Sequence, residues 1–258
     1  MDADAEIALA EFRTLGERMG ISLALTFLAD RLAMRGELAR ACEHFEEAIV
    51  ALTEVGGTED VVGLRARQAQ LYWLLGDERS SASAMAEAQR CAGAIGWPDS
   101  HAELALVQAQ LARWRGEPDK AHEHLARVRA VLDDAERSDS VHAAIMDLYG
   151  YLTEDLDKAR AYRTEALHAV MKYEHPPTIA EVLVGIADLA LRQGDHEQAA
   201  RLLAASEGVR GTPNRSHPDV SRIAAEARNR LGEAVFAEAI RDGRRRDWRE
   251  LAEITLAS

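Results

Sequence analysis

The sequence has few aromatic residues, few prolines and almost no cysteine. Aromatic residues make up 5% of the 258 positions, and there are six prolines and two cysteines. Hydrophobic residues account for 47% and charged residues for 29% of the chain. This balance is typical of a globular protein, and the abundance of Ala, Leu, Arg and Glu favours helices. The composition therefore predicts an all-α protein.

Long apolar runs and targeting signals are also missing. The sequence has no run of about 18 apolar residues, the length needed to cross a bilayer. Nothing in it resembles a secretory signal. We therefore expect a soluble, cytoplasmic protein with no membrane partner. The 31 basic and 44 acidic residues give a net charge of −13. Because most of such a surface would repel nucleic acid, we expect no direct nucleic-acid binding by this chain.

Motifs for catalysis or metal binding are absent. Cys42 and Cys91 fall at different phases of their predicted helices, which favours reduced structural thiols over a disulfide or metal pair. His122 and His124 stand two apart on a helix, about 200° around its axis, so they cannot both bind one ion. There is no His-Glu-x-x-His or Gly-x-Ser-x-Gly sequence. The sequence therefore predicts no catalytic residue, no metal site, no cofactor and no enzymatic activity.

What the sequence does contain is a turn that returns about every 40 residues. The five turns are Gly36-Glu37, Gly76-Asp77, Gly116-Glu117, Glu154-Asp155 and Gly194-Asp195. A small residue recurs five positions after each turn, and usually another seven positions before it. These spacings place the small residues on one face of the helix that follows the turn and of the helix that precedes it. Each repeat is therefore predicted to be two antiparallel helices. Glycine suits the left-handed end of the first helix, and the acidic residue after it can cap the second.

The repeat divides the chain into four parts. Residues 1–16 match only the second helix of a repeat, 20–207 form about five helical hairpins, 208–217 form a loop, and 218–258 form a C-terminal cap. The fourth repeat fits the pattern least well. It lacks the turn glycine, carries Asp147 at the small position and Arg163 at the bulky one, and has Gly150 inside its first helix. We expect a distorted or shortened helix there.

The pattern resembles the tetratricopeptide repeat (TPR) family. The TPR pattern consists of a small residue, a Gly-Asp turn, an alanine and an aromatic residue. This sequence matches them with Ala29, Gly36-Glu37, Ala41 and Phe45. The resemblance covers nearly the whole chain and implies one right-handed superhelical solenoid of antiparallel helix pairs, ending in a set of capping helices. A repeat fold of this kind determines architecture better than function.

The C-terminal part carries a second resemblance. The segments 189–195 and 199–207, with Leu231-Gly232-Glu233, Phe236 and Gly243-Arg244, are similar to the ends of AfsR-like antibiotic regulatory proteins (SARP) and of LuxR/MalT-type activators. In those proteins a TPR region is joined to DNA-binding and nucleotide-binding domains. The chain contains no phosphate-binding loop and no basic recognition helix. The resemblance therefore implies only the regulatory module of a bacterial transcriptional activator.

A binding groove is predicted on the concave face, which first helices line in a TPR stack. Residues six before each turn should form a ladder along it, and aromatic and Arg side chains two or three before the turn are types enriched in recognition hot spots. The candidate binding residues are Asp30, Gln70, Trp73, Gln110, Arg113, Trp114, Tyr151 and Asp188. The expected partner is a protein domain, a peptide or a small effector. Alternatively, Trp73 and Trp114 fill space between repeats.

A second interpretation is a free-standing TPR scaffold that mediates protein–protein interaction or self-association through Trp97 and the N-terminal half-repeat. The half-repeat itself has two explanations, a segment cut from a longer chain or a lone capping helix. A stack cut in mid-repeat would expose an apolar face that includes Ile7, Leu9 and Phe12.

Overall fold

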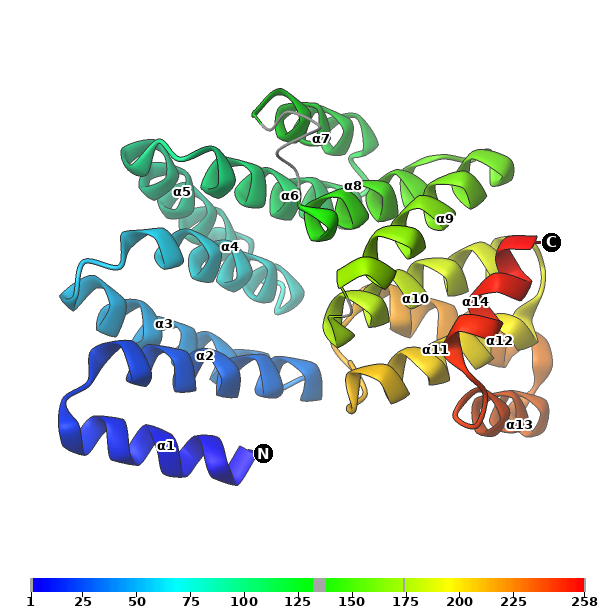
Figure 1. The fold of residues 1–258 in the computed structure, drawn as a ribbon, viewed down its shortest axis with the longest axis horizontal. Coiled ribbons are helices and arrows are strands. Elements are labelled where there is room, and N and C mark those ends of the chain that lie inside the picture. Colours follow the sequence, from blue (N-terminus) through cyan, green and yellow to red (C-terminus); the bar gives the residue numbers. More distant parts are fainter. Residues whose placement is uncertain (1, 132–137, 174, 258) are drawn as a thin grey trace. The chain divides into compact units, whose positions relative to one another are not determined.

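The computed structural model describes residues 2–131, 138–173 and 175–257. All the regular structure in these residues is α-helical, and the helices form antiparallel pairs. This confirms the predicted fold class. The chain divides into two compact units, Met1–Asp133 and Asp134–Ser258, called the first and second units below (Figure 1).

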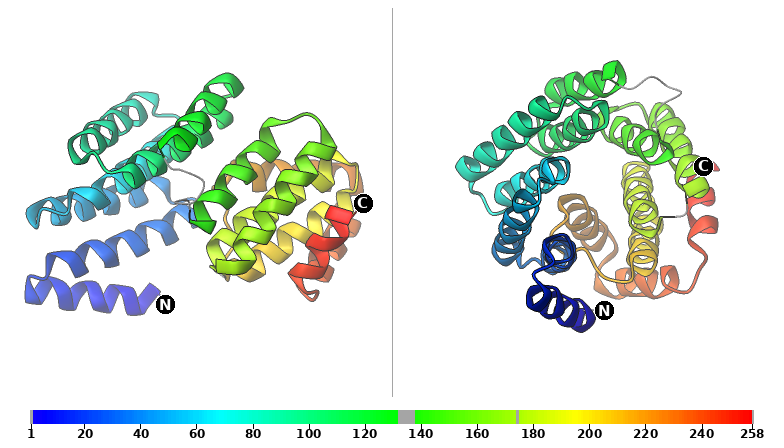
Figure 2. Two further views of the ribbon diagram at one scale, coloured as in Figure 1. Left: turned by 45° about the horizontal axis from the view of Figure 1, so that its top comes forward. Right: turned by 60° about the vertical axis from the view of Figure 1, so that its left-hand side comes forward.

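The first unit begins with a single helix and continues with three helix pairs. Its helices are α1 (Asp2–Leu15), α2 (Arg18–Arg35), α3 (Leu38–Glu54), α4 (Thr58–Leu74), α5 (Glu78–Ile95), α6 (Pro98–Trp114) and α7 (Pro118–Val131). The pairs are α2 with α3, α4 with α5, and α6 with α7 (Figure 2). Each later pair packs through its first helix on the pair before it.

The second unit contains two more pairs and three helices that follow them. Its helices are α8 (Asp139–Leu152), α9 (Leu156–Tyr173), α10 (Pro176–Arg192), α11 (His196–Arg210), α12 (Pro218–Leu231), α13 (Glu233–Gly243) and α14 (Trp248–Ala257). Helix α8 pairs with α9, and α10 with α11. Helix α12 packs on α10 and α11, α13 packs mainly on α11, and α14 contacts α9, α10 and α11. As a result α10 is enclosed on nearly all sides.

The turn glycines have the conformation that the period predicted. Gly36, which follows α2, has a φ of 86°, in the left-handed region where other residues are strained. Its backbone N–H donates to the carbonyl of Ala33 at 2.9 Å, so a carbonyl at the end of α2 is satisfied.

The acidic residue after the turn acts differently in different repeats. Asp77 accepts a hydrogen bond from the backbone N–H of Ser80 at 3.0 Å and so caps α5. Glu37 makes no side-chain cap bond to α3 and instead forms an ion pair with Arg40 in the first turn. The prediction of an acidic cap is therefore right for Asp77 and wrong for Glu37.

The irregular residues of the fourth repeat form one buried cluster. Arg163 has no exposed surface, donates to the carbonyl of Asp147 at 2.6 Å and pairs with its carboxylate. Its guanidinium lies where a Cβ on Gly150 or Gly185 would be. Helix α8 is shorter than α4, with 14 residues against 17, as expected. It is not distorted at Gly150, however, because the missing side chain makes room for the arginine.

The end of α8 lacks a glycine and is satisfied by another helix. Arg192 of α10 donates to the carbonyls of Gly150 at 3.1 Å and Thr153 at 2.6 Å. A cation is favourable at this end of a helix. Arg192 thus serves the role that the turn glycine has in other repeats.

Two other expectations need correction. Helix α11 continues through Gly208 to Arg210, because Gly211, with a φ of 76°, is the residue that ends it. The loop therefore covers 211–217 rather than 208–217. At the N-terminus Leu9 is buried and Phe12 is half-buried against α2, so of the expected apolar face only Ile7, at 59%, is largely exposed.

Candidate functional site

The most distinctive feature of the first unit is a pair of stacked tryptophans. Trp73 is the last residue but one of α4, and Trp114 is the last residue of α6. Their ring centroids lie 5.8 Å apart and their planes differ by 13°. Such an offset stack stabilises the contact by about 0.5–1.5 kcal/mol beyond its area. Both side chains remain half-buried rather than enclosed, so the pair joins α4 to α6 and still presents aromatic surface.

Polar groups surround the second tryptophan. The Gln110 amide, with its oxygen facing both donors, accepts from Trp114 Nε1 at 2.7 Å and from Arg113 Nη2 at 2.5 Å. The Arg113 guanidinium carbon also lies 6.0 Å from the centre of the Trp114 ring, within reach of a cation–π interaction. Four of the predicted site residues therefore meet at one place. We call Trp73, Gln110, Arg113 and Trp114 the tryptophan platform.

Asp30 and Gln70 extend this surface along α2 and α4. Asp30 forms an ion pair with Arg67 of α4. Gln70 is half-buried and lies between Arg67 and Trp73, three residues from each, so the three share one face of α4. The charged residue Arg67 was not predicted as part of the site. Its position three residues before Gln70 was the sequence signal that could have identified it.

Apolar side chains on α2 were also missed. Leu23 is 65% exposed and Phe27 is 38% exposed, and Asp30 follows Phe27 by three residues on the same helix face. The face formed by α2, α4 and α6 thus combines exposed apolar groups, an ion pair and two aromatic rings.

The two predicted residues of the second unit have other surroundings. Tyr151 has the Arg163 guanidinium carbon 4.0 Å from its ring centre. Asp188, predicted on an open face, is only 3% exposed. It pairs with Arg222 because α12 packs over this side of α10, and with Arg192 at 3.7 Å. The candidate site is therefore confined to the tryptophan platform and its neighbours in the first unit.

The two cysteines are free thiols. Cys42 is buried in α3, and burial, with the nearby carboxylate of Glu43, raises its pKa to about 11. It therefore stays protonated at neutral pH and is a poor nucleophile or metal ligand. Within residues 2–131, 138–173 and 175–257, no three His, Cys, Asp or Glu side chains gather where they could hold a metal ion.

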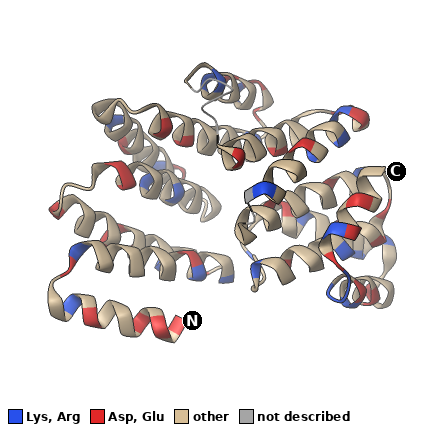
Figure 3. Cartoon of the chain, in the orientation of Figure 1, with Lys and Arg blue, Asp and Glu red and all other residues tan. Residues whose placement is uncertain are grey.

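Charge and hydropathy agree with the composition of the chain. Acidic and basic residues are interspersed along the helices of each unit (Figure 3). In the part of the chain that the structure describes, none of the helices has the length and apolar character needed to span a bilayer.

Comparison with known proteins supports the architecture. No protein-family model and no curated protein matches the sequence. Among solved structures, the chain is similar to BtubC (BKLC) from P. vanneervenii, with a TM-score of 0.55 and 18% identity over 84% of this chain and 92% of that one. At this identity the likeness concerns the fold alone, a helical-repeat stack. The resemblance to TPR proteins and to AfsR-like regulators stays a prediction.

A helical-repeat fold does not by itself identify a function. What distinguishes this chain is the composition of one face. Tryptophan and arginine are the residue types most enriched in binding hot spots, and here they lie in contact with each other.

Proposed function

We propose that this protein is a binding module whose recognition surface is the tryptophan platform with Asp30, Arg67 and Gln70. The partner is a protein domain, a peptide or a small effector, and the chain itself carries out no catalysis. The observation that carries the proposal is the Trp73–Trp114 stack with Arg113 and Gln110 beside it. Such a surface offers flat apolar area, a fixed cation and an amide, which suits a peptide or a ring-shaped ligand.

The platform is suited to binding because its side chains are already held in place. The stack fixes both rings, and Gln110 orients Trp114 and Arg113 together. A ligand that binds there immobilises few additional rotamers, which lowers the entropic cost of association. The Asp30–Arg67 pair and the exposed Phe27 can extend the contact along α2.

The resemblance of the C-terminal segments to AfsR-like and LuxR/MalT-type activators supports a more specific role. In this proposal the chain is the cytoplasmic regulatory module of a bacterial transcriptional activator, and it does not bind DNA itself. A ligand that prefers one arrangement of the parent protein would shift it between repressed and active states.

A second candidate function is a scaffold that self-associates. Trp97 is 53% exposed and borders a pocket of about 390 Å³ lined by Cys91, Ala94 and Ile95. Exposed aromatic surface next to an apolar pocket is a feature of contact sites. Sedimentation velocity of the original chain and of Trp97→Ala tests this candidate. A dimer that the substitution dissociates supports the scaffold. An original chain that stays monomeric at about 100 μM, a concentration at which weak dimers form, contradicts it.

The binding function is tested by site-specific photo-crosslinking in extracts of the source cells. p-Benzoylphenylalanine at Gln70 should capture a defined partner or ligand, and the same group at the exposed residue Arg79 of α5 should not. Adding Trp73→Ala and Trp114→Ala to the Gln70 probe should remove the crosslink. Equal crosslinking from both positions, or a crosslink that survives loss of both tryptophans, would contradict the proposal.

A further inference from the structure

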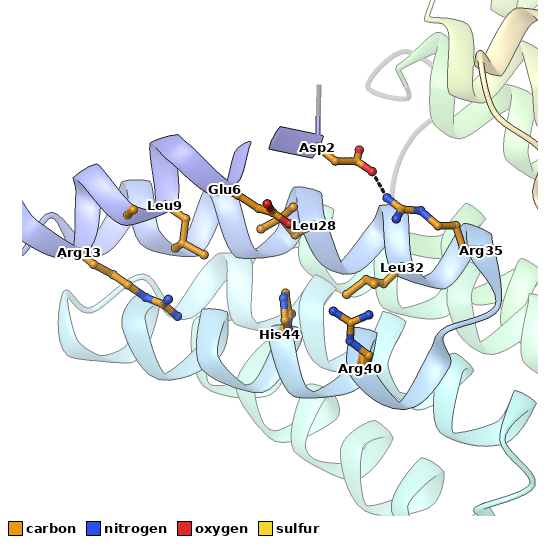
Figure 4. A pocket seen from close by; sticks show the side chains of 10 residues that line it. Asp2, Glu6, Leu9, Arg13, Leu28, Leu32, Arg35, Arg40 and His44 are labelled. Atoms are coloured by element: carbon orange, nitrogen blue, oxygen red, sulfur yellow. Dashed lines mark hydrogen bonds and ion pairs between the residues drawn. The ribbon is translucent and has the colours of Figure 1, made fainter. Parts of the chain in front are cut away.

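A groove runs between α1 and α3, with α2 as its floor. It contains two pockets of about 250 and 280 Å³ that share Arg13. In the first of these pockets, of about 250 Å³, Leu9, Leu28 and Leu32 form an apolar base (Figure 4). Arg40 and His44 of α3 line the opposite wall of this pocket.

The same combination of helices occurs in the second unit, and there a helix fills the space. Helices α9, α10 and α11 correspond to α1, α2 and α3, and α14 contacts all three. Leu251, Ala252 and Thr255 are the buried residues of α14. The side-chain amide of Gln198 donates to the carbonyl of Leu251 at 2.8 Å and to Thr255 Oγ1 at 3.1 Å, which fixes the helix in its groove.

The correspondence holds residue by residue when positions are counted from the turn glycines Gly36 and Gly194. The matched residues are Leu28 and Ile186, Leu32 and Ala190, Arg40 and Gln198, and His44 and Leu202. In the second unit the three apolar members are fully buried, in one cluster with Leu251 and Ala252. In the first unit Leu28 and Leu32 keep 7% and 6% exposure, and His44 is half-buried. The first pocket is thus the open counterpart of the site that α14 occupies.

The polar groups of the open groove differ from those under α14. Arg40 stands in place of Gln198 and His44 in place of Leu202, and the other charged residues that line the pocket are Asp2, Glu6, Arg13 and Arg35. Arg13, Arg35 and Arg40 each form an ion pair within the chain, with Glu47, Asp2 and Glu37 respectively. The Arg40 side chain is 62% exposed, so it can turn from Glu37 toward a carboxylate on an incoming helix. His44 Nδ1 is buried and has no hydrogen-bond partner among the residues that the structure describes.

We propose that the groove between α1 and α3 binds an amphipathic helix of a partner protein. This helix presents an apolar stripe spaced like Leu251, Ala252 and Thr255 in α14. It also carries carboxylates beside the stripe, which face Arg40 and Arg13. The site is separate from the tryptophan platform and does not depend on the function proposed for it.

The probe for this site is a fluorescein-labelled peptide with the sequence of residues 247–258 in which Arg249 is replaced by Glu. Its binding to the full chain is measured by fluorescence polarisation. We expect Arg40→Glu to raise the Kd at least about tenfold, because it places like charges together. Arg79→Glu is the matched control, since Arg79 occupies the first turn of α5 as Arg40 does that of α3, and it should leave the Kd unchanged.

A second peptide, in which Leu251 is also replaced by Asp, should bind at least about tenfold more weakly because it loses the apolar stripe. Trp73→Ala should not affect either peptide. Binding that Arg40→Glu leaves intact and Gln198→Ala weakens would mean that the peptide displaces α14, and would overturn the proposal. No binding below about 1 mM would also overturn it. Self-association of the full chain that Arg40→Glu removes would assign the groove to a second copy instead of a partner.

Discussion

Arg163 occupies the space that Gly150 leaves empty: a Cβ on Gly150 would lie 2.7 Å from Arg163 Nε. Gly185 of α10 borders the same guanidinium from the other side. The arginine comes from α9 and passes between α8 and α10, where it meets Asp147 and the ring of Tyr151. A buried cation is tolerable there because its charge is paired and because two helices omit a side chain around it.

Gly150→Ala should therefore destabilise the protein, although alanine normally favours a helix. Crowding against the guanidinium is expected to reduce the free energy of unfolding by about 1–3 kcal/mol. The control is Gly93→Ala in α5, where nothing lies within 4 Å of the new Cβ and alanine should stabilise by about 0.5–1 kcal/mol. Urea unfolding measures both, and equal effects of the two substitutions would contradict the crowding at Gly150.

The Asp147–Arg163 pair is expected to be coupled. Asp147→Ala or Arg163→Leu alone should cost about 3–5 kcal/mol, because each leaves a buried charge without its ion pair. The double variant restores the Ala and Leu typical of the other repeats and should be about as stable as the original chain. A double-mutant cycle by urea unfolding measures the coupling. Additive losses would show that the two residues act independently.

The loop before α12 should respond to pH. Burial would lower the pKa of His217, but Glu181 and Asp219 outweigh this and raise it above its ordinary value of 6.5. Burial would raise the pKa of Glu181, but His217 and Arg210 lower it to about 2 from 4.5. The stabilising effect of His217 is thus complete below about pH 6.5 and is lost as pH rises through its raised pKa. The effect of Glu181 is present above about pH 4.5 and is lost as pH falls toward 2.

His217→Gln removes the titrating charge at this site. The stability difference between the original chain and this variant should be largest at about pH 5–6 and should shrink as pH is raised to about 9. Thermal unfolding at several pH values measures it, with the exposed His168→Gln as the control. A difference that grows between pH 6 and 9 would have the wrong sign for a raised pKa.

Helix α13 depends on a close approach to α11. A Cβ on Gly243 would lie 2.6 Å from the Cα of Arg201, a backbone atom that cannot turn aside. Gly243→Ala should displace the end of α13 and increase hydrogen exchange of its amides at least about tenfold, which corresponds to about 1.4 kcal/mol. Gly208→Ala in α11, where the added Cβ meets nothing within 4 Å, should leave that exchange unchanged. Unchanged exchange in the Gly243 variant would contradict the close packing.

The helix pairs could be predicted because their signals are local. Gly36 adopts the left-handed conformation that glycine tolerates best, and the 40-residue period repeats that signal. Local signals failed where two glycines compete for one role, as when Gly211 rather than Gly208 ends α11. Leu9 was expected to be exposed because its own repeat lacks a first helix, but α2 of the next repeat covers it.

The surroundings of the site residues could be predicted only in part. Trp73, Arg113 and Trp114 lie together because their distance from the turn fixes their place on neighbouring helices. Asp188 has the same kind of spacing, yet α12 buries it, and nothing in the repeat indicates where a helix outside the repeat will pack. Likewise Asp147 and Arg163 each looked like a mismatch, because their pairing is visible only in three dimensions.

The central claim, that the tryptophan platform is the binding surface, is tested most directly by calorimetric titration with the partner captured from Gln70. Three variants decide it: the triple substitution Trp73→Ala, Arg113→Ala and Trp114→Ala, the milder Trp114→Phe, and Trp97→Ala as an exposed tryptophan outside the platform. The triple variant should lose at least about a hundredfold in affinity while it keeps its helical circular dichroism, Trp114→Phe should lose less, and Trp97→Ala should bind normally. Full affinity in the folded triple variant, or loss of binding in Trp97→Ala alone, would contradict the account.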